Sequence, residues 1–273
     1  MDLKIMGSGD ATGGIYENVK IMGSGDITGD VECVSYSVMG SGDLHGNLKT
    51  QLLKISGSGD IDGDVCAEEI IINGSGDLMR NVECRFLKIN GSGDVQGDVK
   101  AEEIMISGSG DIEGNVKAEQ VIISGSGEIE GNCECEKFIG KGSFTVGGFL
   151  NSEEVEITLS SSCEIEEIGA SKVTVTRGDQ FRRGEQFAGG GFFNKVLKFA
   201  TSMTGMLECR VIEANEIYLE NSEVDIVRGD TVIIGEGCEI GTIEYRDVCE
   251  INPKSSADKV IRIGSSNTDI TVM

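Results

Sequence analysis

Residues 87–99 read LKINGSGDVQGDV, and this pattern recurs through the first half of the chain. Its central tetrapeptide, Gly-Ser-Gly-Asp or Gly-Ser-Gly-Glu, occurs eight times, and a degenerate ninth copy begins at Gly142-Ser143. Successive copies are separated by 16 residues once and by 17 residues thereafter. Their leading glycines are Gly7, Gly23, Gly40, Gly57, Gly74, Gly91, Gly108 and Gly125. A fixed period of this size indicates a repeat architecture in which each unit contacts only its neighbours.

Apolar and polar residues alternate on both sides of each tetrapeptide. Leu53 and Ile55 precede one copy, and Ile61 and Val65 follow it. This period of two, together with the β-branched content, predicts short strands. The glycines between the strands predict corners, because glycine adopts positive φ without a steric penalty. Three short strands and three corners in one repeat match a coil of a parallel β-helix, in which coils stack about 4.8 Å apart.

The strand pattern continues after the tetrapeptide has disappeared. We therefore predict two regions, a regular β-helix of 17-residue coils over 1–148 and an irregular β-solenoid over 149–273. Residues 178–207 interrupt the second region with a basic, phenylalanine-rich segment. It is either a loop packed on the solenoid wall or an element that docks onto a partner or a membrane surface. The residues predicted for docking are Arg182, Arg183, Phe192, Phe193, Lys195, Lys198 and Phe199.

Composition narrows the class of function. The chain has 47 acidic and 23 basic residues, a net charge of −24, which disfavours nucleic acid and anionic lipid as generic partners. It contains no apolar run long enough to span a bilayer and starts without a signal-peptide pattern. Nine cysteines form no disulfide framework, so a reducing cytoplasm is the expected location. Membrane contact is left open.

The chain does not have the residues expected of an enzyme. It has no tryptophan, 5% aromatic residues and one histidine, His45, and no catalytic cluster is recognisable. We therefore expect neither catalysis nor a cofactor, although a β-helix hydrolase or transferase is the alternative that a groove with clustered carboxylates would favour.

One corner of the predicted coil carries a row of stacked carboxylates. We expect each of them to accept N–H groups of its own turn, which offsets their mutual repulsion. Divalent cations held between neighbouring carboxylates are the alternative, so the row is a weak candidate metal site. Its central members are Asp43, Asp60, Asp77, Asp94 and Asp111.

The serial Lys-Ile-x-Gly-Ser-Gly-Asp coils of residues 1–145 and the stretch 227–245 resemble bactofilins, in particular the longer type of spore-forming Gram-positive bacteria. This resemblance implies a right-handed parallel β-helix that polymerises end to end into non-polar filaments without nucleotide. It also implies a cytoskeletal scaffold in cell shape, wall synthesis or motility, whose partners are other copies of the chain and envelope or motility proteins. A non-polymerising binding platform that docks through 178–207 is the competing interpretation.

The two ends of the predicted solenoid are the expected polymerisation faces. A β-helix has unpaired strand edges at its ends, and such edges pair with other chains unless they are capped. The sequence shows no cap before the first coil. The residues predicted for the two faces are Leu3, Ile5 and Met6 at one end and Val260, Ile261 and Ile263 at the other.

Overall fold

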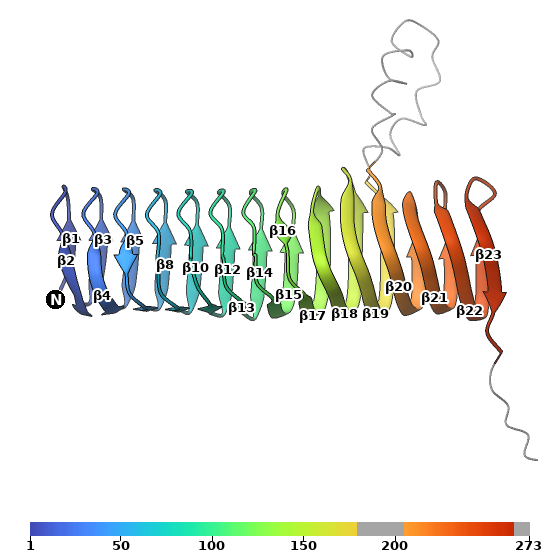
Figure 1. Ribbon diagram of the computed structural model, residues 1–273, viewed down its shortest axis with the longest axis horizontal. Coiled ribbons are helices and arrows are strands. Elements are labelled where there is room, and N and C mark those ends of the chain that lie inside the picture. The colour runs from blue at the N-terminus through green and yellow to red at the C-terminus, as the bar shows by residue number, and fades with distance from the viewer. Residues whose placement is uncertain (179–204, 265–273) are drawn as a thin grey trace, which may run out of the picture.

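The computed structural model describes residues 1–178 and 205–264, which form one long β-solenoid (Figure 1). Its strands pair in parallel throughout, and no helix occurs in the described part. The chain winds through about 14 coils stacked along the long axis of the rod. The prediction of an all-β parallel β-helix is therefore confirmed.

The strands of the first coils are short, because corners interrupt them every few residues. They are β1 (Leu3–Ile5), β2 (Ala11–Ile15), β3 (Asn18–Ile21), β4 (Ile27–Glu32), β5 (Ser35–Val38), β6 (Leu44–His45), β7 (Leu48–Lys49), β8 (Leu52–Ile55), β9 (Val65–Cys66), β10 (Glu69–Ile72), β11 (Val82–Glu83), β12 (Phe86–Ile89), β13 (Val99–Lys100) and β14 (Glu103–Ile106).

Most of the later strands are longer, because the chain turns its corners while remaining in β conformation. They are β15 (Val116–Ile123), β16 (Glu128–Ile129), β17 (Cys133–Gly142), β18 (Thr145–Leu159), β19 (Cys163–Arg177), β20 (Leu207–Leu219), β21 (Ser222–Ile234), β22 (Glu239–Ile251) and β23 (Ser256–Arg262). Strand β18 crosses residue 148 without a break, so the regular and irregular regions belong to one continuous solenoid.

Equivalent residues of successive coils lie side by side, and we call each such row a column. Ile70 of β10, for example, pairs with Leu53 of β8 on one side and with Leu87 of β12 on the other. Inward columns are apolar and almost completely buried, whereas the alternating outward columns are mostly polar. The hydrophobic core is thus a set of stacked aliphatic columns that runs the length of the rod.

Tyr36 is the exception in its inward column, because it brings a hydroxyl into this core. Its side chain is 0% exposed, and its hydroxyl has no hydrogen-bond partner. Burial, with smaller contributions from Cys33, Asp43 and Asp26, raises the pKa of Tyr36 above its ordinary value.

We predict that Tyr36→Phe stabilises the protein, because a buried hydroxyl without a partner costs about 1–3 kcal/mol. The free energy of unfolding, measured by urea titration at a fixed protein concentration, should rise by roughly 1 kcal/mol. A fall in stability would show that a water molecule or a shifted acceptor satisfies the hydroxyl. Tyr218→Phe is the control, since the hydroxyl of Tyr218 donates to Glu220 at 2.7 Å and its loss should be destabilising.

The corner glycines are required for a different reason from the one that the sequence suggested. Among the described glycines, positive φ occurs at Gly29, Gly142, Gly237 and Gly14, and not at the glycines of the eight tetrapeptides. The tetrapeptide corners instead stack so closely that a Cβ on Gly74 would overlap the carbonyl oxygen of Gly57 in the preceding coil. The prediction of left-handed corners is therefore wrong for these positions, where close stacking of the backbone selects glycine.

Coils of two lengths occur along the rod, in separate blocks. In the long coils, three residues separate two successive inward residues, as between Ile27 and Val31. In the short coils only two residues intervene, as between Ile165 and Ile168. The register shifts where the two kinds meet, between β2 and β4 and again between β18 and β19. The first coil is therefore of the short kind, like the coils from β19 to β23 and unlike its own neighbour.

The solenoid is continuous across the interruption near residue 190. Strand β19 ends at Arg177, strand β20 begins at Leu207, and the two strands pair directly from Cys163–Leu207 to Val175–Leu219. All the docking residues proposed from sequence, Arg182, Arg183, Phe192, Phe193, Lys195, Lys198 and Phe199, lie outside the described residues.

Candidate assembly surfaces

One end of the rod presents the unpaired edges of β1 and β2. Each of these strands pairs on one side only, β1 with β3 and β2 with β4. Of the three residues predicted for this face, Met6 is 74% exposed, Leu3 is half-buried, and Ile5 points into the core. A charge at Ile5 would therefore disturb the first coil itself and could not separate folding from assembly.

The opposite end presents the last coil, in which β23 pairs only with β22 (Figure 1). Val260 continues the inward column of Ile243, yet it is 45% exposed, because no described coil covers it. Ile261 lies in the neighbouring outward column and is half-buried, and Ile263 follows the strand with its amide bonded to the carbonyl of Tyr245. The structure thus places the two predicted groups at opposite ends of one rod.

The columns identify further exposed residues at the two ends of the rod, which sequence reasoning missed. Lys4 and Ile15 are exposed in the first coil, and Glu250 and Arg262 are exposed in the last. The repeat pattern places the first coil in its columns. It does not place the last coil, whose register depends on the interruption and on the short coils.

The row of carboxylates runs along one corner and is bonded from coil to coil. The amide of Asp94 donates to Oδ1 of Asp77 at 2.9 Å, and the amide of Asp77 donates to Oδ1 of Asp60 at 2.8 Å. The same contact links every neighbouring pair from Asp10 to Glu128, at 2.8–3.2 Å. Each aspartate of the row therefore accepts an N–H of the next coil, which corrects the expectation that the donor belongs to its own turn.

Stacking these carboxylates changes their acidity. Burial raises the pKa of the Asp77 carboxyl above its ordinary value; the bond from Asp94 opposes this, and the charges of Asp60 and Asp94 add to it. Burial likewise raises the pKa of Asp111 and of Glu128. No group of three or more His, Cys, Asp or Glu side chains within 1–178 and 205–264 is arranged to hold a metal ion.

A second row of side chains also accepts hydrogen bonds from the amides of the next coil, and fewer of its members are charged. The amide of each residue again donates to the side-chain oxygen of the residue one coil before it, for example Asn47 to Asp30 at 2.8 Å and Asp64 to Asn47 at 2.9 Å. Aspartate and asparagine alternate along most of this row, so none of its carboxylates are direct neighbours. Its members are Asp30, Asn47, Asp64, Asn81, Asp98, Asn115 and Asn132.

An outward column beside this second row holds ion pairs between coils. Lys49 contacts Glu32 at 3.3 Å, Lys100 contacts Glu83 at 2.8 Å, and Lys117 contacts Glu134 at 2.8 Å. These pairs are solvent-exposed, so each contributes roughly 0–1 kcal/mol.

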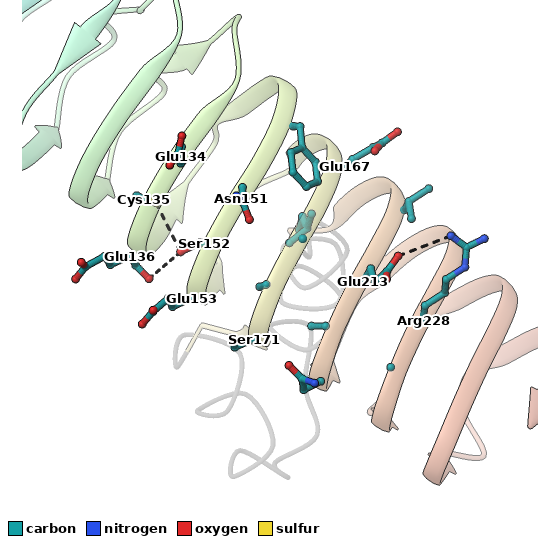
Figure 2. Close-up of a pocket in the computed structure, with 18 of the residues that line it drawn as sticks. Glu134, Cys135, Glu136, Asn151, Ser152, Glu153, Glu167, Ser171, Glu213 and Arg228 are labelled. Atoms are coloured by element: carbon teal, nitrogen blue, oxygen red, sulfur yellow. Dashed lines mark hydrogen bonds and ion pairs between the residues drawn. The ribbon is translucent and has the colours of Figure 1, made fainter. Parts of the chain in front are cut away.

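Figure 2 shows a groove where the outer corner is lined by small side chains. Cys135 donates to the Ser152 hydroxyl over 3.6 Å, and that hydroxyl donates to the carbonyl of Glu136 at 3.0 Å. Arg228 contacts Glu213, its neighbour in the adjacent coil, at 3.8 Å beside the same groove. The groove exists because the side chains that line it are small, and its rim is predominantly acidic. Cys135, Ser152 and Arg228 all make their contacts with neighbouring coils. No helix able to cross a bilayer occurs in the described residues.

Residues 41–116 match the family described as bactofilin, polymer-forming cytoskeletal. The chain is 40% identical over 109 residues to the uncharacterized protein YhbF of Bacillus subtilis, covering 40% of this chain and 39% of that protein. It is 36% identical over 115 residues to the uncharacterized protein YhbE of the same organism, covering 41% and 42%. The chain thus spans about two fifths of either relative's length. No solved structure matches significantly.

Proposed function

Because the chain belongs to the bactofilin family through residues 41–116, a family of polymer-forming cytoskeletal proteins, we propose that it is a scaffold that assembles end to end without nucleotide. The family is structural, and its polymer-forming character supports self-association. Cell shape, wall synthesis and motility are the processes in which such a scaffold would act. We further propose the cytoplasm as its location.

The observation that carries this proposal is the pair of uncovered end coils. Strands β1 and β2 at one end and β23 at the other each have a free edge within the described residues. At these ends, columns that are buried elsewhere are open to solvent, as Val260 shows against Ile243. Pairing of a free strand edge with a second chain satisfies backbone groups and buries apolar side chains in one step.

Negative-stain electron microscopy of the purified chain, with chelator and without nucleotide, tests this function. We expect filaments whose width is that of one rod or of a few rods. Discrete rods of one length at all concentrations would contradict the proposal. They would favour the binding platform, whose proposed docking residues lie outside the described part of the chain.

A further inference from the structure

We infer that two copies of the chain pack side by side and antiparallel, through one face near the middle of the rod. The face is built around one outward column, which we call the middle column because it lies between the two inward columns of strands such as β8 and β10. Its first ten members are Lys4, Lys20, Ser37, Lys54, Ile71, Lys88, Met105, Ile122, Ile139 and Glu156. The contact uses only the members from Lys54 to Glu156, so it is separate from the proposed end-to-end assembly.

The centre of the middle column is apolar although its side chains point outward. Its partly exposed apolar members are Ile71, Met105, Ile122 and Ile139. The ring of Phe86, in the neighbouring outward column, is 38% exposed and belongs to the same face. By contrast, the column that holds the ion pairs between coils contains no aliphatic side chain over the same coils. An apolar strip on a surface that is otherwise mostly polar marks a contact site.

The lysines of the middle column lack the carboxylate partners that lysines on another side of the rod have. Lys100 and Lys117 each contact a glutamate of an adjacent coil at 2.8 Å. No ion pair within residues 1–178 and 205–264 includes Lys54 or Lys88, and both are exposed. The column therefore carries uncompensated positive charge on one side of its apolar centre, although the chain as a whole is acidic.

The other side of the apolar centre is acidic. Glu156 of the middle column and Glu154 beside it both contact Lys137, at 2.8 and 2.9 Å, so two carboxylates share one ammonium group. An anionic lipid surface would attract the lysines of this face and repel these glutamates. A second copy in the reverse orientation attracts both, because it offers glutamates to the lysines and lysines to the glutamates. The distribution of charge thus favours a second copy as the partner.

An antiparallel contact centred on Met105 matches the apolar and the charged parts together. Ile71 and Ile139 lie two coils before and two coils after Met105, so each faces the other across the contact. Lys54 and Glu156 lie three coils before and after it and face each other likewise. Each pair occurs twice, because a two-fold axis relates the copies. A parallel contact would instead place Lys54 against Lys54 and Glu156 against Glu156, and like charges repel.

The outward column next to the middle column fits the same alignment. Glu69 and Lys137 lie two coils before and two coils after Glu103, so they would form a further attractive pair across the contact. Phe86 would face Gln120, one coil to either side. The two copies of Glu103 would meet near the two-fold axis, which is the repulsive pair of this alignment. Removing that charge should therefore strengthen an antiparallel contact.

Cross-linking of cysteine variants tests the contact and its direction. Ile71→Cys and Ile139→Cys are made separately in a Cys66→Ser background, because Cys66 is the exposed native thiol. A short bis-maleimide bridges the distance of about 10 Å between packed sheets. We expect cross-linked dimers from the mixture of the two variants. Ile71→Cys alone should give none, because its two copies would lie at least about 19 Å apart, which is four coils at about 4.8 Å.

Gln96→Cys, on another side of the rod, is the control for random collision when it is mixed with Ile139→Cys. A yield from the Ile71→Cys and Ile139→Cys mixture no higher than that of the control would overturn the inference. Dimers of Ile71→Cys with itself would show a parallel contact and would also overturn it. So would slow thiol labelling of Ile71→Cys in dilute protein, which would show that another part of the same chain covers this face.

Charge reversal in the same cysteine variants is the second measurement. At low salt, Lys54→Glu and Glu156→Lys should each raise the protein concentration for half-maximal cross-linking about five- to tenfold, and the double variant should restore it. Glu103→Gln should lower this concentration. Arg80→Glu is the matched control, because it makes the same change of charge at an exposed residue that forms no ion pair with the described residues. Equal effects of Lys54→Glu and Arg80→Glu would overturn the inference.

The side-by-side contact and the proposed end-to-end assembly can fail separately. Filaments one rod wide, without the mixed cross-link, would contradict only the side-by-side contact. Cross-linked pairs without filaments would contradict only the proposed function. Binding of the natural chain to vesicles of anionic lipid that Lys54→Glu abolishes, without the mixed cross-link, would assign this face to a membrane and overturn the inference.

Discussion

Gly74→Ala is expected to lower the free energy of unfolding by about 3 kcal/mol or more, the upper end of the range for overpacked sites. A Cβ on Gly74 would overlap the carbonyl oxygen of Gly57, and Ser56 also lies too close. All of these are backbone atoms of the preceding coil, and they cannot yield without breaking the coil-to-coil hydrogen bonds at this corner. Urea unfolding followed by circular dichroism would measure the change.

Gly7→Ala is the matched control, because Gly7 occupies the same column in the first coil. Nothing lies within 4 Å of a Cβ placed there. The free energy of unfolding should therefore stay within about 0.5 kcal/mol of that of the natural chain. Equal losses for Gly7→Ala and Gly74→Ala would show that the corner needs glycine for its conformation, and the explanation by close stacking would then fail.

Asp77→Ala is expected to cost about 1–2 kcal/mol, because it leaves the amide of Asp94 without its acceptor. Asp77→Asn keeps an acceptor oxygen and removes one charge from a row of like charges, so its stability should equal or exceed that of the natural chain. The second row of the solenoid, where Asn47 and Asn81 stand between aspartates, already shows that asparagine can hold this bond. A loss in Asp77→Asn as large as that in Asp77→Ala would contradict this account.

The same row gives the stability a characteristic dependence on pH. The folded-state pKa of Asp77, Asp111 and Glu128 is raised above the ordinary values of 3.8 and 4.5. The folded protein therefore takes up protons before the unfolded chain does. The contribution of these groups to the free energy of unfolding falls as pH rises from about 4 through the raised pKa, and it is constant above that.

Mild acidification from neutral pH should accordingly stabilise the natural chain, and Asp77→Asn should show a smaller rise. At lower pH the trend reverses, because bonds to lysine and other partners lower the pKa of Glu83, Asp230 and Glu236, whose stabilisation is lost on protonation. The melting temperature of the natural chain and of Asp77→Asn, measured in steps of pH, would check these trends. A profile for Asp77→Asn that is parallel to that of the natural chain would exclude Asp77 as a contributor.

The sequence by itself determined the solenoid, because each repeat contains the pattern that specifies its own strands and corners. Residues such as Ile55 and Ile61 alternate with polar neighbours, and a fixed period stacks like on like, so strands, inward columns and the carboxylate row follow from local pattern alone. The end of the rod at Leu3 follows in the same way, whereas the register of the last coil, around Val260, does not. Because successive repeats have the same pattern, the strands and columns can be predicted without knowledge of contacts between distant residues.

Tertiary structure decided everything that depends on where one coil lies against another. The amide of Asp94, not one from its own turn, satisfies Asp77, and close stacking on Gly57 selects glycine at position 74. Ile15 and Ile261 begin and end the same outward column. This is known only from the pairing of β19 with β20 and from two register shifts, and the local sequence signals none of these. Register is fixed by the packing of whole coils, since a slip of one residue would turn every side chain of a strand to the other face.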